Sequence, residues 1–230
     1  NSSSPYGKEC RECWTVPNGY KLVGIDASGL ELRMLAHYMQ DKEYTNEIIN
    51  GDVHTANQRL AGLESRNQAK TFIYALLYGA GDEKLGSVAG GGRKAGKRLR
   101  KSFFDNLPTF TTLKDKVSRA STRGYLKGLD GRKLFVRSEH SALNTLLQGA
   151  GAIICKHWLL RIIHRVYNKK LDVKLVASVH DEYQFEVANK DVGEFCSITK
   201  IAIKETENLL KLRCPLDNDY KVGTTWAETH

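Results

Sequence analysis

Two strand-like segments near the end of the chain strongly constrain its fold. Residues 173–179 (VKLVASV) and 182–187 (EYQFEV) are rich in β-branched and apolar side chains, and only His180 and Asp181 separate them. A two-residue connection joins antiparallel strands, whereas parallel strands need a crossover of about a dozen residues. The sequence therefore predicts a tight hairpin within an antiparallel sheet, with Asp181 at its tip.

A third predicted strand, residues 20–26 (YKLVGID), also ends on an acidic residue. Apolar residues then recur at helical spacing through residues 29–39, so Asp26 lies where a strand gives way to a helix. Side chains at such positions can leave the sheet and reach a site. Taken alone, Asp26 and Asp181 each have a simpler interpretation as a helix cap or a turn residue.

The pair has a chemical interpretation that neither aspartate has by itself. Two carboxylates at adjacent strand ends can hold two divalent ions about 4 Å apart, which activates an attacking hydroxyl and stabilises a leaving oxygen in phosphoryl transfer. Two Mg²⁺ ions suit such a site, because Mg²⁺ takes few protein carboxylates and leaves positions for substrate phosphates. The neighbouring Glu182 points the other way in an extended strand, so we expect it to support the site without binding metal.

Most of the remaining chain is predicted to be helical. A glycine-rich connection at 79–92 has room for one short helix, and the Asp130-Gly131 turn predicts a second hairpin over 125–137. Strands and helices come in blocks without βαβ alternation, which favours the α+β class. The predicted helices cover residues 29–39, 44–49, 65–78, 93–104, 109–122, 141–168 and 191–211.

The predicted helix at 65–78 carries a stripe of functional side chains. Arg66, Lys70 and Tyr74 recur every four residues, so they share one face, and Tyr78 continues it. Such a stripe is either a solvated surface with an aromatic edge or a site for a nucleoside triphosphate, with cations for phosphates and a flat ring for the base. The opposite, packing face comprises Phe72, Ile73, Leu76 and Leu77.

Composition limits the classes of partner and compartment. The chain has 35 Lys and Arg against 26 Asp and Glu, a net charge of +9, which favours a polyanionic partner. The five cysteines are an odd number and include one CxxC pair, Cys10 and Cys13, without the second pair of ligands that zinc needs; reduced thiols are expected. We expect no signal peptide and no apolar run of the roughly 18 residues needed for a membrane span.

Read together, these motifs resemble family A DNA polymerases. The motifs are DASGLELR at 26–33, the RxxxKxxxYxxxYG helix ending at Gly79, and VHDE at 179–182; residues 127–152 (KGLDGRKLFVRSEHSALNTLLQGAGA) add a fourth. The match is nearest to replicative polymerases of T-seven-like phages and more distant to bacterial DNA polymerase I. The resemblance implies a palm of antiparallel sheet with flanking helices (1–38 and 139–230) and inserted helical fingers (39–138).

The resemblance also implies roles for individual residues. Asp26 and Asp181 would bind both metals with help from the Ala27 carbonyl. Glu31 would pack beneath the incoming sugar and exclude a 2′-hydroxyl. Arg66, Lys70 and His54 would hold the triphosphate, Lys70 also protonating pyrophosphate, and Tyr74 would lie against sugar and base, as in members that accept dideoxynucleotides readily. Template and primer contacts would come from Tyr78 and Gly79 beside the templating base, from Arg11, His140, Asn144 and Gln148 in the minor groove, and from His180 near the primer end.

The basic segment at 93–104 remains open to two interpretations. Its cations are Arg93, Lys94, Lys97, Arg98, Arg100 and Lys101. They can form an exposed face of the fingers or contact the template backbone, and a backbone contact would weaken with salt.

Two expectations concern what lies beyond this sequence, and two alternative functions stay open. No thumb and no exonuclease-like region are found, so we expect an N-terminal polymerase chain to supply them, either as the partner in a naturally split enzyme or as the rest of a longer protein. The expected setting is the cytoplasm of a phage-infected bacterial cell. The alternatives are a single-subunit RNA polymerase fragment, against which Glu31 argues, and a catalytically silent DNA-binding or assembly subunit, against which Asp26, Arg66, Lys70 and Asp181 argue.

Overall fold

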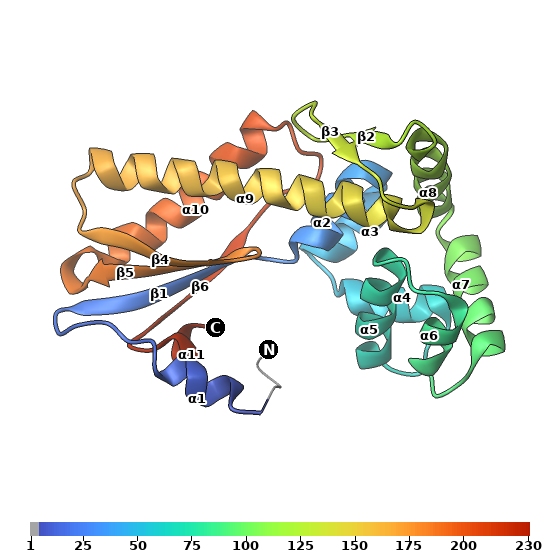
Figure 1. Cartoon of the computed structure of the whole chain (residues 1–230), viewed down its shortest axis with the longest axis horizontal. Coiled ribbons are helices and arrows are strands. Elements are labelled where there is room, and N and C mark those ends of the chain that lie inside the picture. The colour runs from blue at the N-terminus through green and yellow to red at the C-terminus, as the bar shows by residue number, and fades with distance from the viewer. Residues whose placement is uncertain (1–4) are drawn as a thin grey trace. The chain divides into compact units, whose positions relative to one another are not determined.

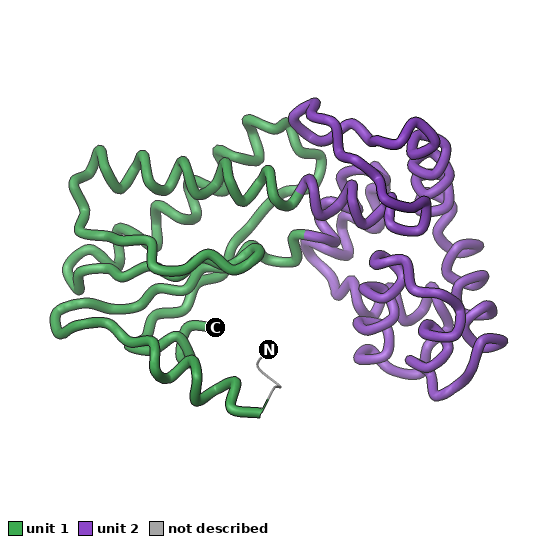
Figure 2. Tube along the Cα trace, viewed as in Figure 1, with its two compact units in different colours: residues 1–30, 151–230 green, residues 31–150 purple. Residues whose placement is uncertain are grey.

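The computed structural model describes residues 5–230, which form two compact units (Figures 1 and 2). Unit 1 contains the chain up to Leu30 and again from Gly151 to His230, and unit 2 contains Glu31–Ala150. The sheet is antiparallel and the remaining elements are mainly helices, so the predicted α+β class is confirmed. The subdomain limits 1–38, 39–138 and 139–230 remain a prediction.

Unit 1 is built on a four-stranded sheet in the order β4-β5-β1-β6, with every neighbouring pair antiparallel. Its strands are β1 (Tyr20–Ala27), β4 (Val173–Val179), β5 (Glu182–Ala188) and β6 (Asn218–Gly223). The predicted hairpin is β4–β5. The strand β6 was not predicted, because its sequence NDYKVG begins with two residues that are depleted in strands.

Two helices cover one face of this sheet (Figure 1): α9 (Ala142–Asn168), which begins in unit 2 and continues into unit 1, and α10 (Val192–Leu209). Trp158 on α9 is fully buried, and its indole Nε1 donates to the Thr199 carbonyl on α10 at 3.0 Å. The rings of Phe185 on β5 and Phe195 on α10 lie 4.8 Å apart. These contacts form a core that fixes the strand ends.

The segment containing α9 corrects the expectation about membrane spans. By length and composition, Glu139–Asn168 is apolar enough to cross a membrane, although only 44% of its most apolar window is buried inside the protein. A core helix has the same composition. Ile154, Trp158 and Ile162 are fully buried, so α9 serves as a core helix in this fold.

The described part of unit 1 also contains short elements. They are α1 (Gly7–Glu12) and α11 (Trp226–Thr229) near the chain ends, and the 3₁₀ turn η2 (Asn189–Asp191) between β5 and α10. Thr15 forms a β-bridge with Thr225, and the Trp226 amide donates to the Trp14 carbonyl at 3.0 Å. These contacts hold the C-terminal segment against the segment that precedes β1.

Unit 2 is predominantly helical and has its own core. Phe72, Phe103 and Phe110 are fully buried, with neighbouring ring centroids 5.8 and 5.3 Å apart. Its elements are α2 (Leu30–Met39), α3 (Lys42–Ile49), α4 (Val53–Ala61), α5 (Arg66–Leu77), α6 (Asp82–Ser87), α7 (Arg93–Asn106), α8 (Pro108–Ser121), the hairpin β2 (Tyr125–Lys127) and β3 (Lys133–Phe135), and the 3₁₀ turn η1 (Glu139–Ser141).

Within unit 2, every predicted helix is present, and α4 is an addition. Asp52 caps α4, since its carboxylate accepts hydrogen bonds from the amides of His54 at 3.1 Å and Thr55 at 3.4 Å. An aspartate before a short polar helix is a recognisable start signal. The weak amphipathic pattern of VHTANQRLA concealed this helix.

Candidate active site

The structure brings Asp26 and Asp181 together at one end of the sheet in unit 1. The Ala27 amide donates to the Asp181 carbonyl at 3.2 Å, which fastens the hairpin tip to the end of β1. At the tip, His180 adopts the left-handed conformation with φ 57°, which is uncommon for a residue other than glycine. The turn thereby places Asp181 next to the strand that carries Asp26.

The strand register gathers further carboxylates around Asp26. Asp26 lies opposite Glu182 on β5 and opposite Asp219 on β6. Asp26 is exposed to solvent and lines a cavity of about 280 Å³ together with Glu182 and Asp219. Desolvation, followed by repulsion from Asp181, Glu182 and Asp219, raises its pKa to about 7. Because the neighbouring carboxylates make a further negative charge on Asp26 unfavourable, they make a bound cation favourable at the same place.

Glu182 is held by other protein groups. One carboxylate oxygen accepts hydrogen bonds from Gln184 Nε2 at 2.7 Å and Trp226 Nε1 at 2.9 Å, and the other lies 2.6 Å from His230 Nδ1. These contacts occupy both oxygens, and the supporting role of Glu182 remains a prediction. The contacts also link the site to the C-terminal segment.

Asp219 is the residue that sequence reasoning missed here. It lies on the unpredicted strand β6, and its Oδ2 accepts a hydrogen bond from Ser28 Oγ at 2.8 Å. Only the pairing of β6 with β1 brings it beside Asp26. No signal in the sequence around Asp219 could have found it.

The donor set fits ions that need few protein ligands. Among the described residues, no group of three or more His, Cys, Asp or Glu side chains is arranged to hold a single metal. Mg²⁺ commonly binds through one or two carboxylates and keeps several waters, so Asp26 and Asp181 are sufficient for it. Zinc, which prefers four closely placed ligands, fits this set poorly.

Desolvation and repulsion at the Asp26 carboxylate predict that Asp26→Asn stabilises the metal-free chain against unfolding. The folded-state pKa of about 7 lies above the ordinary aspartate pKa of 3.8. Asp26 therefore has no effect on stability below about pH 4, and its destabilising effect grows with pH until it is complete above about pH 7. After discounting for solvent screening, the gain is about 1 kcal/mol, or a rise in Tm of roughly 2–4 °C at about pH 8 in EDTA.

Thermal denaturation of both proteins across this pH range measures the effect. The exposed Asp115 on α8 provides a control, since Asp115→Asn removes one charge without relieving this repulsion. An equal rise in Tm at about pH 4 and about pH 8 would contradict the assignment, because protonation removes the repulsion at the lower pH.

In unit 2, one face of α5 and the start of α4 gather the predicted triphosphate-binding residues. Arg66 Nε pairs with Asp52 Oδ2 at 2.6 Å, and the His54 and Tyr74 rings lie 6.2 Å apart. Partial burial, followed by the charges of Arg66 and Lys70, lowers the pKa of His54. The exposed Lys70 forms no ion pair with any described residue, so its ammonium is available to a ligand.

Local sequence explains why α5 presents this face. Ser65 Oγ accepts from the Gln68 amide at 3.2 Å while Gln68 Oε1 accepts from the Ser65 amide at 3.2 Å, forming a capping box immediately before Arg66. The opposite face is buried, as predicted, through Phe72, Ile73, Leu76 and Leu77. Packing on one side thus orients the cations on the other.

A second polar cluster joins α2, the end of α5 and α9 within unit 2. Tyr78 Oη donates to Glu31 Oε1 at 2.6 Å, and Gln148 Nε2 donates to the same oxygen. Burial, then the hydrogen bond to Glu31, raises the pKa of Tyr78 to about 12. Three predicted site residues from distant positions therefore constrain one another.

The other predicted template and primer residues fall in both units. Gly79 has φ 79°, and a Cβ there would meet the His140 carbonyl at 2.5 Å, so this approach requires glycine. His140 is exposed on η1, and Asn144 is half-buried on α9. In unit 1, Arg11 Nη1 donates to the Gly7 carbonyl at 2.8 Å, and its guanidinium lies 5.4 Å from the Trp226 ring.

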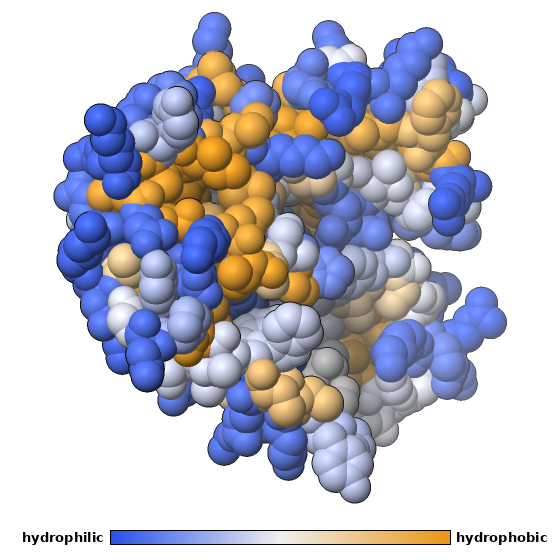
Figure 3. Space-filling view, turned by 60° about the vertical axis from the view of Figure 1, so that its left-hand side comes forward, coloured by the Kyte–Doolittle hydropathy of each residue, from blue (hydrophilic) through white to orange (hydrophobic). Residues whose placement is uncertain are grey.

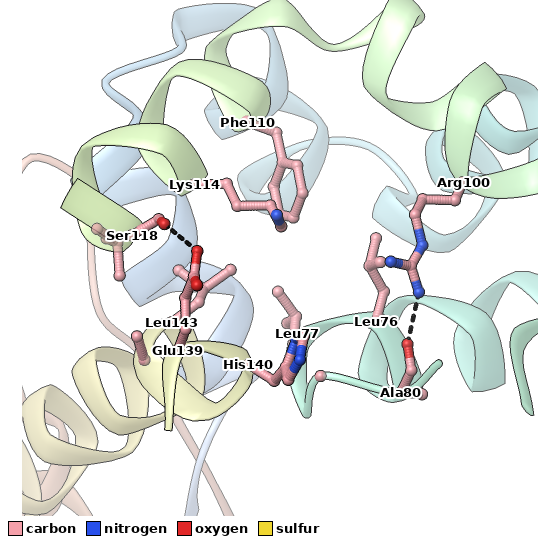
Figure 4. A pocket seen from close by; sticks show the side chains of 13 residues that line it. Leu76, Leu77, Ala80, Arg100, Phe110, Lys114, Ser118, Glu139, His140 and Leu143 are labelled. Atoms are coloured by element: carbon pink, nitrogen blue, oxygen red, sulfur yellow. Dashed lines mark hydrogen bonds between the residues drawn. The ribbon is translucent and has the colours of Figure 1, made fainter. Parts of the chain in front are cut away.

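A cavity of about 200 Å³ lies at the C-terminal end of α5 (Figure 4). Leu76, Leu77 and Phe110 give it apolar walls, and Lys114 and His140 also point toward it. Arg100 at its edge donates to the Ala80 carbonyl at 2.7 Å. The cavity is too small for a nucleotide but adjoins Gly79, which the resemblance associates with the templating base.

Comparison with known proteins identifies close relatives. The model for DNA polymerase family A matches residues 2–228. The DNA-directed DNA polymerases of Enterobacteria phage T3 and Escherichia phage T7 are each 40% identical over 260 aligned residues, covering 99% of this chain and 37% of each relative. The thermostable DNA polymerase I of Thermus filiformis is 28% identical, covering 98% of this chain and 29% of the relative.

A solved structure shows a matching fold. The POL domain of Pol1 from M. smegmatis, in complex with DNA primer-template and dNTP, aligns with a TM-score of 0.88 and 23% identity. The alignment covers 98% of this chain and 43% of that one. This chain thus spans less than half the length of each of these relatives.

Proposed function

Because the chain belongs to the family A DNA polymerases, we propose that it carries the nucleotidyl-transfer centre of a template-directed DNA polymerase. The reaction joins a deoxynucleoside monophosphate to a primer 3′-hydroxyl and releases pyrophosphate. One observation carries this proposal: the hydrogen bond from the Ala27 amide to the Asp181 carbonyl, at 3.2 Å, brings the aspartates of two separate motifs to one site. Convergence of these carboxylates is what two-metal phosphoryl transfer requires.

Members of the family generally use divalent metal ions. We propose two Mg²⁺ ions held by Asp26 and Asp181 with the Ala27 carbonyl; when bound, they supply Lewis acidity and neutralise phosphate charge. The strand pairing of β1 with β5 and β6 holds the carboxylates in place before substrate arrives. Such preorganisation avoids the cost of ordering charged side chains during the reaction.

The α5 face provides the substrate-binding part of the mechanism. Arg66 and Lys70 bind the triphosphate, and Lys70 donates a proton to the departing pyrophosphate. Since the pKa of His54 is lowered, its ring is neutral near pH 7 and donates a hydrogen bond without adding charge. The ring of Tyr74 offers a flat surface to the sugar and base.

Glu31 provides the test of substrate class, because it separates DNA synthesis from RNA synthesis. We expect Glu31→Ala to weaken discrimination against ribonucleotides by roughly a hundredfold, since it removes the side chain proposed to occupy the space of the 2′-hydroxyl. It also frees Tyr78 and Gln148 from their shared partner. The measurement is single-turnover primer extension with paired deoxy- and ribonucleotides, at protein concentrations high enough to offset weak DNA binding.

Two comparisons make this test decisive. Glu31→Gln keeps the side-chain volume, so it should retain most of the discrimination. Glu43→Ala removes an exposed glutamate on α3 and should have no effect. Equal use of both nucleotide classes by the unaltered chain would instead favour an RNA polymerase, and no incorporation of either would contradict the proposed enzyme activity.

We further propose that the full enzyme includes an N-terminal polymerase polypeptide carrying the thumb and exonuclease regions, in the cytoplasm of a phage-infected bacterial cell. More than half of each phage relative lies outside the matched region. Unit 1 also exposes apolar side chains on one face of α9, at Leu160, Ile163 and Tyr167, which are 63%, 46% and 80% accessible.

The edge of the sheet adds to this apolar surface. The edge strand β4 exposes Leu175 and Val176, and its outer backbone groups pair with no strand among the described residues. Figure 3 shows apolar residues gathered into a broad area bordered by polar ones. Exposed apolar edge strands favour association, so we propose that this surface receives the missing polymerase polypeptide.

A further inference from the structure

One face of α7 concentrates positive charge. At 100° per residue, its cations occupy an arc of about 140° on the side opposite the buried residues Gly96, Leu99 and Phe103. All of these cations are exposed: Arg93, Lys94, Lys97, Arg98 and Lys101. The buried side packs the helix into unit 2, so the basic side faces solvent.

Four of these cations lack a compensating anion. Lys101 pairs with Asp105, but within the described residues no ion pair involves Arg93, Lys94, Lys97 or Arg98. Arg93 and Lys97, and likewise Lys94 and Arg98, are four residues apart, a spacing at which like charges destabilise a helix. Cations in the first turn also oppose the helix dipole. The arrangement is unfavourable for α7 alone and favourable for binding a polyanion.

The charged face begins at a cavity that adjoins the proposed templating position. A space of about 380 Å³ is lined by Gly79, Arg93, Arg100 and His140, together with Gly81 and the acidic Asp82 and Glu83. Arg100 Nε pairs with Asp82 at 3.0 Å, whereas Arg93, which also lines the cavity, forms no ion pair among the described residues. This space shares Gly79, Ala80, Arg100 and His140 with the smaller cavity of Figure 4.

We propose that α7 binds the unpaired template strand ahead of the templating base, through phosphate contacts from Arg93, Lys94, Lys97 and Arg98. This inference rests on the proposed function, which places Gly79 beside the templating base. A strand leaving that position meets Arg93 first and then the remaining cations along the helix. Continuity with the cavity favours DNA over an acidic protein segment, and phosphate contacts make the binding independent of sequence.

Fluorescence anisotropy with synthetic primer-template DNA tests this inference. Two DNAs are compared that differ only in the length of the 5′ template overhang, which is one nucleotide in the first and about ten in the second. The longer overhang lies within the site sizes known for proteins that bind single strands. For the unaltered chain, the longer overhang should tighten binding by roughly tenfold at low salt. Substituting Arg93, Lys94, Lys97 and Arg98 with Gln, a good helix former, should abolish this gain and reduce the salt dependence of log Kd by about 3.

A matched control removes the same charge elsewhere. Lys42, Lys116, Lys156 and Lys190 are exposed and dispersed over the chain, and replacing all four with Gln should preserve the overhang-dependent gain. Circular dichroism checks that both variants fold. Single-nucleotide incorporation on the short-overhang DNA should be equal in the α7 variant and the control, which separates this inference from the proposed chemistry.

Two results would overturn the inference. The first is retention of the overhang-dependent gain by the folded α7 variant, and the second is loss of this gain in the dispersed control as well. If the α7 variant keeps the gain but loses binding to a polyglutamate peptide, the surface is assigned to an acidic protein partner.

Discussion

Replacing Asp181 with Asn is expected to lower single-turnover nucleotide incorporation by roughly a thousandfold or more, with little change in DNA affinity. Asn keeps the shape of the side chain but removes the negative charge that the two proposed divalent ions require, which corresponds to several kcal/mol of transition-state stabilisation. The backbone contact between Asp181 and Ala27 involves main-chain atoms only, so the hairpin should keep its position.

Single-turnover primer extension measures the rate, and anisotropy measures DNA binding. Asp115→Asn on α8 removes an equal charge from an exposed helix and should leave the rate unchanged. Near-normal synthesis by the Asp181 variant would refute the two-metal assignment. A parallel loss of DNA binding would instead show that the substitution disturbs the fold.

The second large effect is expected at Lys70, where substitution by Ala should slow incorporation by roughly a hundredfold to a thousandfold. The side chain is exposed on the same face of α5 as Arg66 and Tyr74, and it forms no ion pair with any described residue. Its loss removes both the proposed phosphate contact and the proposed proton donor, each a substantial contribution to phosphoryl transfer.

Lys70→Arg separates these two roles. Arginine keeps the positive charge but does not give up its proton under ordinary conditions. If Lys70 is the acid, the variant should bind the nucleotide nearly normally and still react slowly, so kcat falls while KM changes little. Recovery of the full rate by arginine would reduce the role of Lys70 to charge alone. Lys116→Ala on α8 serves as the unaffected control.

Short-range patterns accounted for much of the site. The capping box before Arg66, the four-residue spacing of Arg66, Lys70 and Tyr74, and the two-residue turn at Asp181 are all local in sequence. Local hydrogen bonds and helical periodicity depend on residues within a few positions, so a single sequence is enough to predict them. The roles assigned to these residues nevertheless remain predictions.

The sequence did not predict the contacts between segments that are far apart in the chain. Asp219 joins the carboxylate group only because β6 pairs with β1, and the segment around it has little strand character. The partners that occupy Glu182, above all Trp226 and His230, lie more than 40 residues away. Asp52 pairs with Arg66 and caps α4. The weak amphipathic pattern of α4 did not predict a helix there, so the sequence offered no reason to single out Asp52.

The sequence alone was enough to predict the α+β class, the hairpin with Asp181 at its tip and the shared face of Arg66, Lys70 and Tyr74 on α5, because each follows from the order and spacing of residues along the chain. Three features required the folded chain: the three carboxylates near Asp26, the cluster of Glu31, Tyr78 and Gln148, and the cavity beside Gly79 at which the cations of α7 begin. These features depend on strand register and helix packing, where residues far apart in the chain meet. Their energies come from burial and from charge at short distance, which no local pattern specifies.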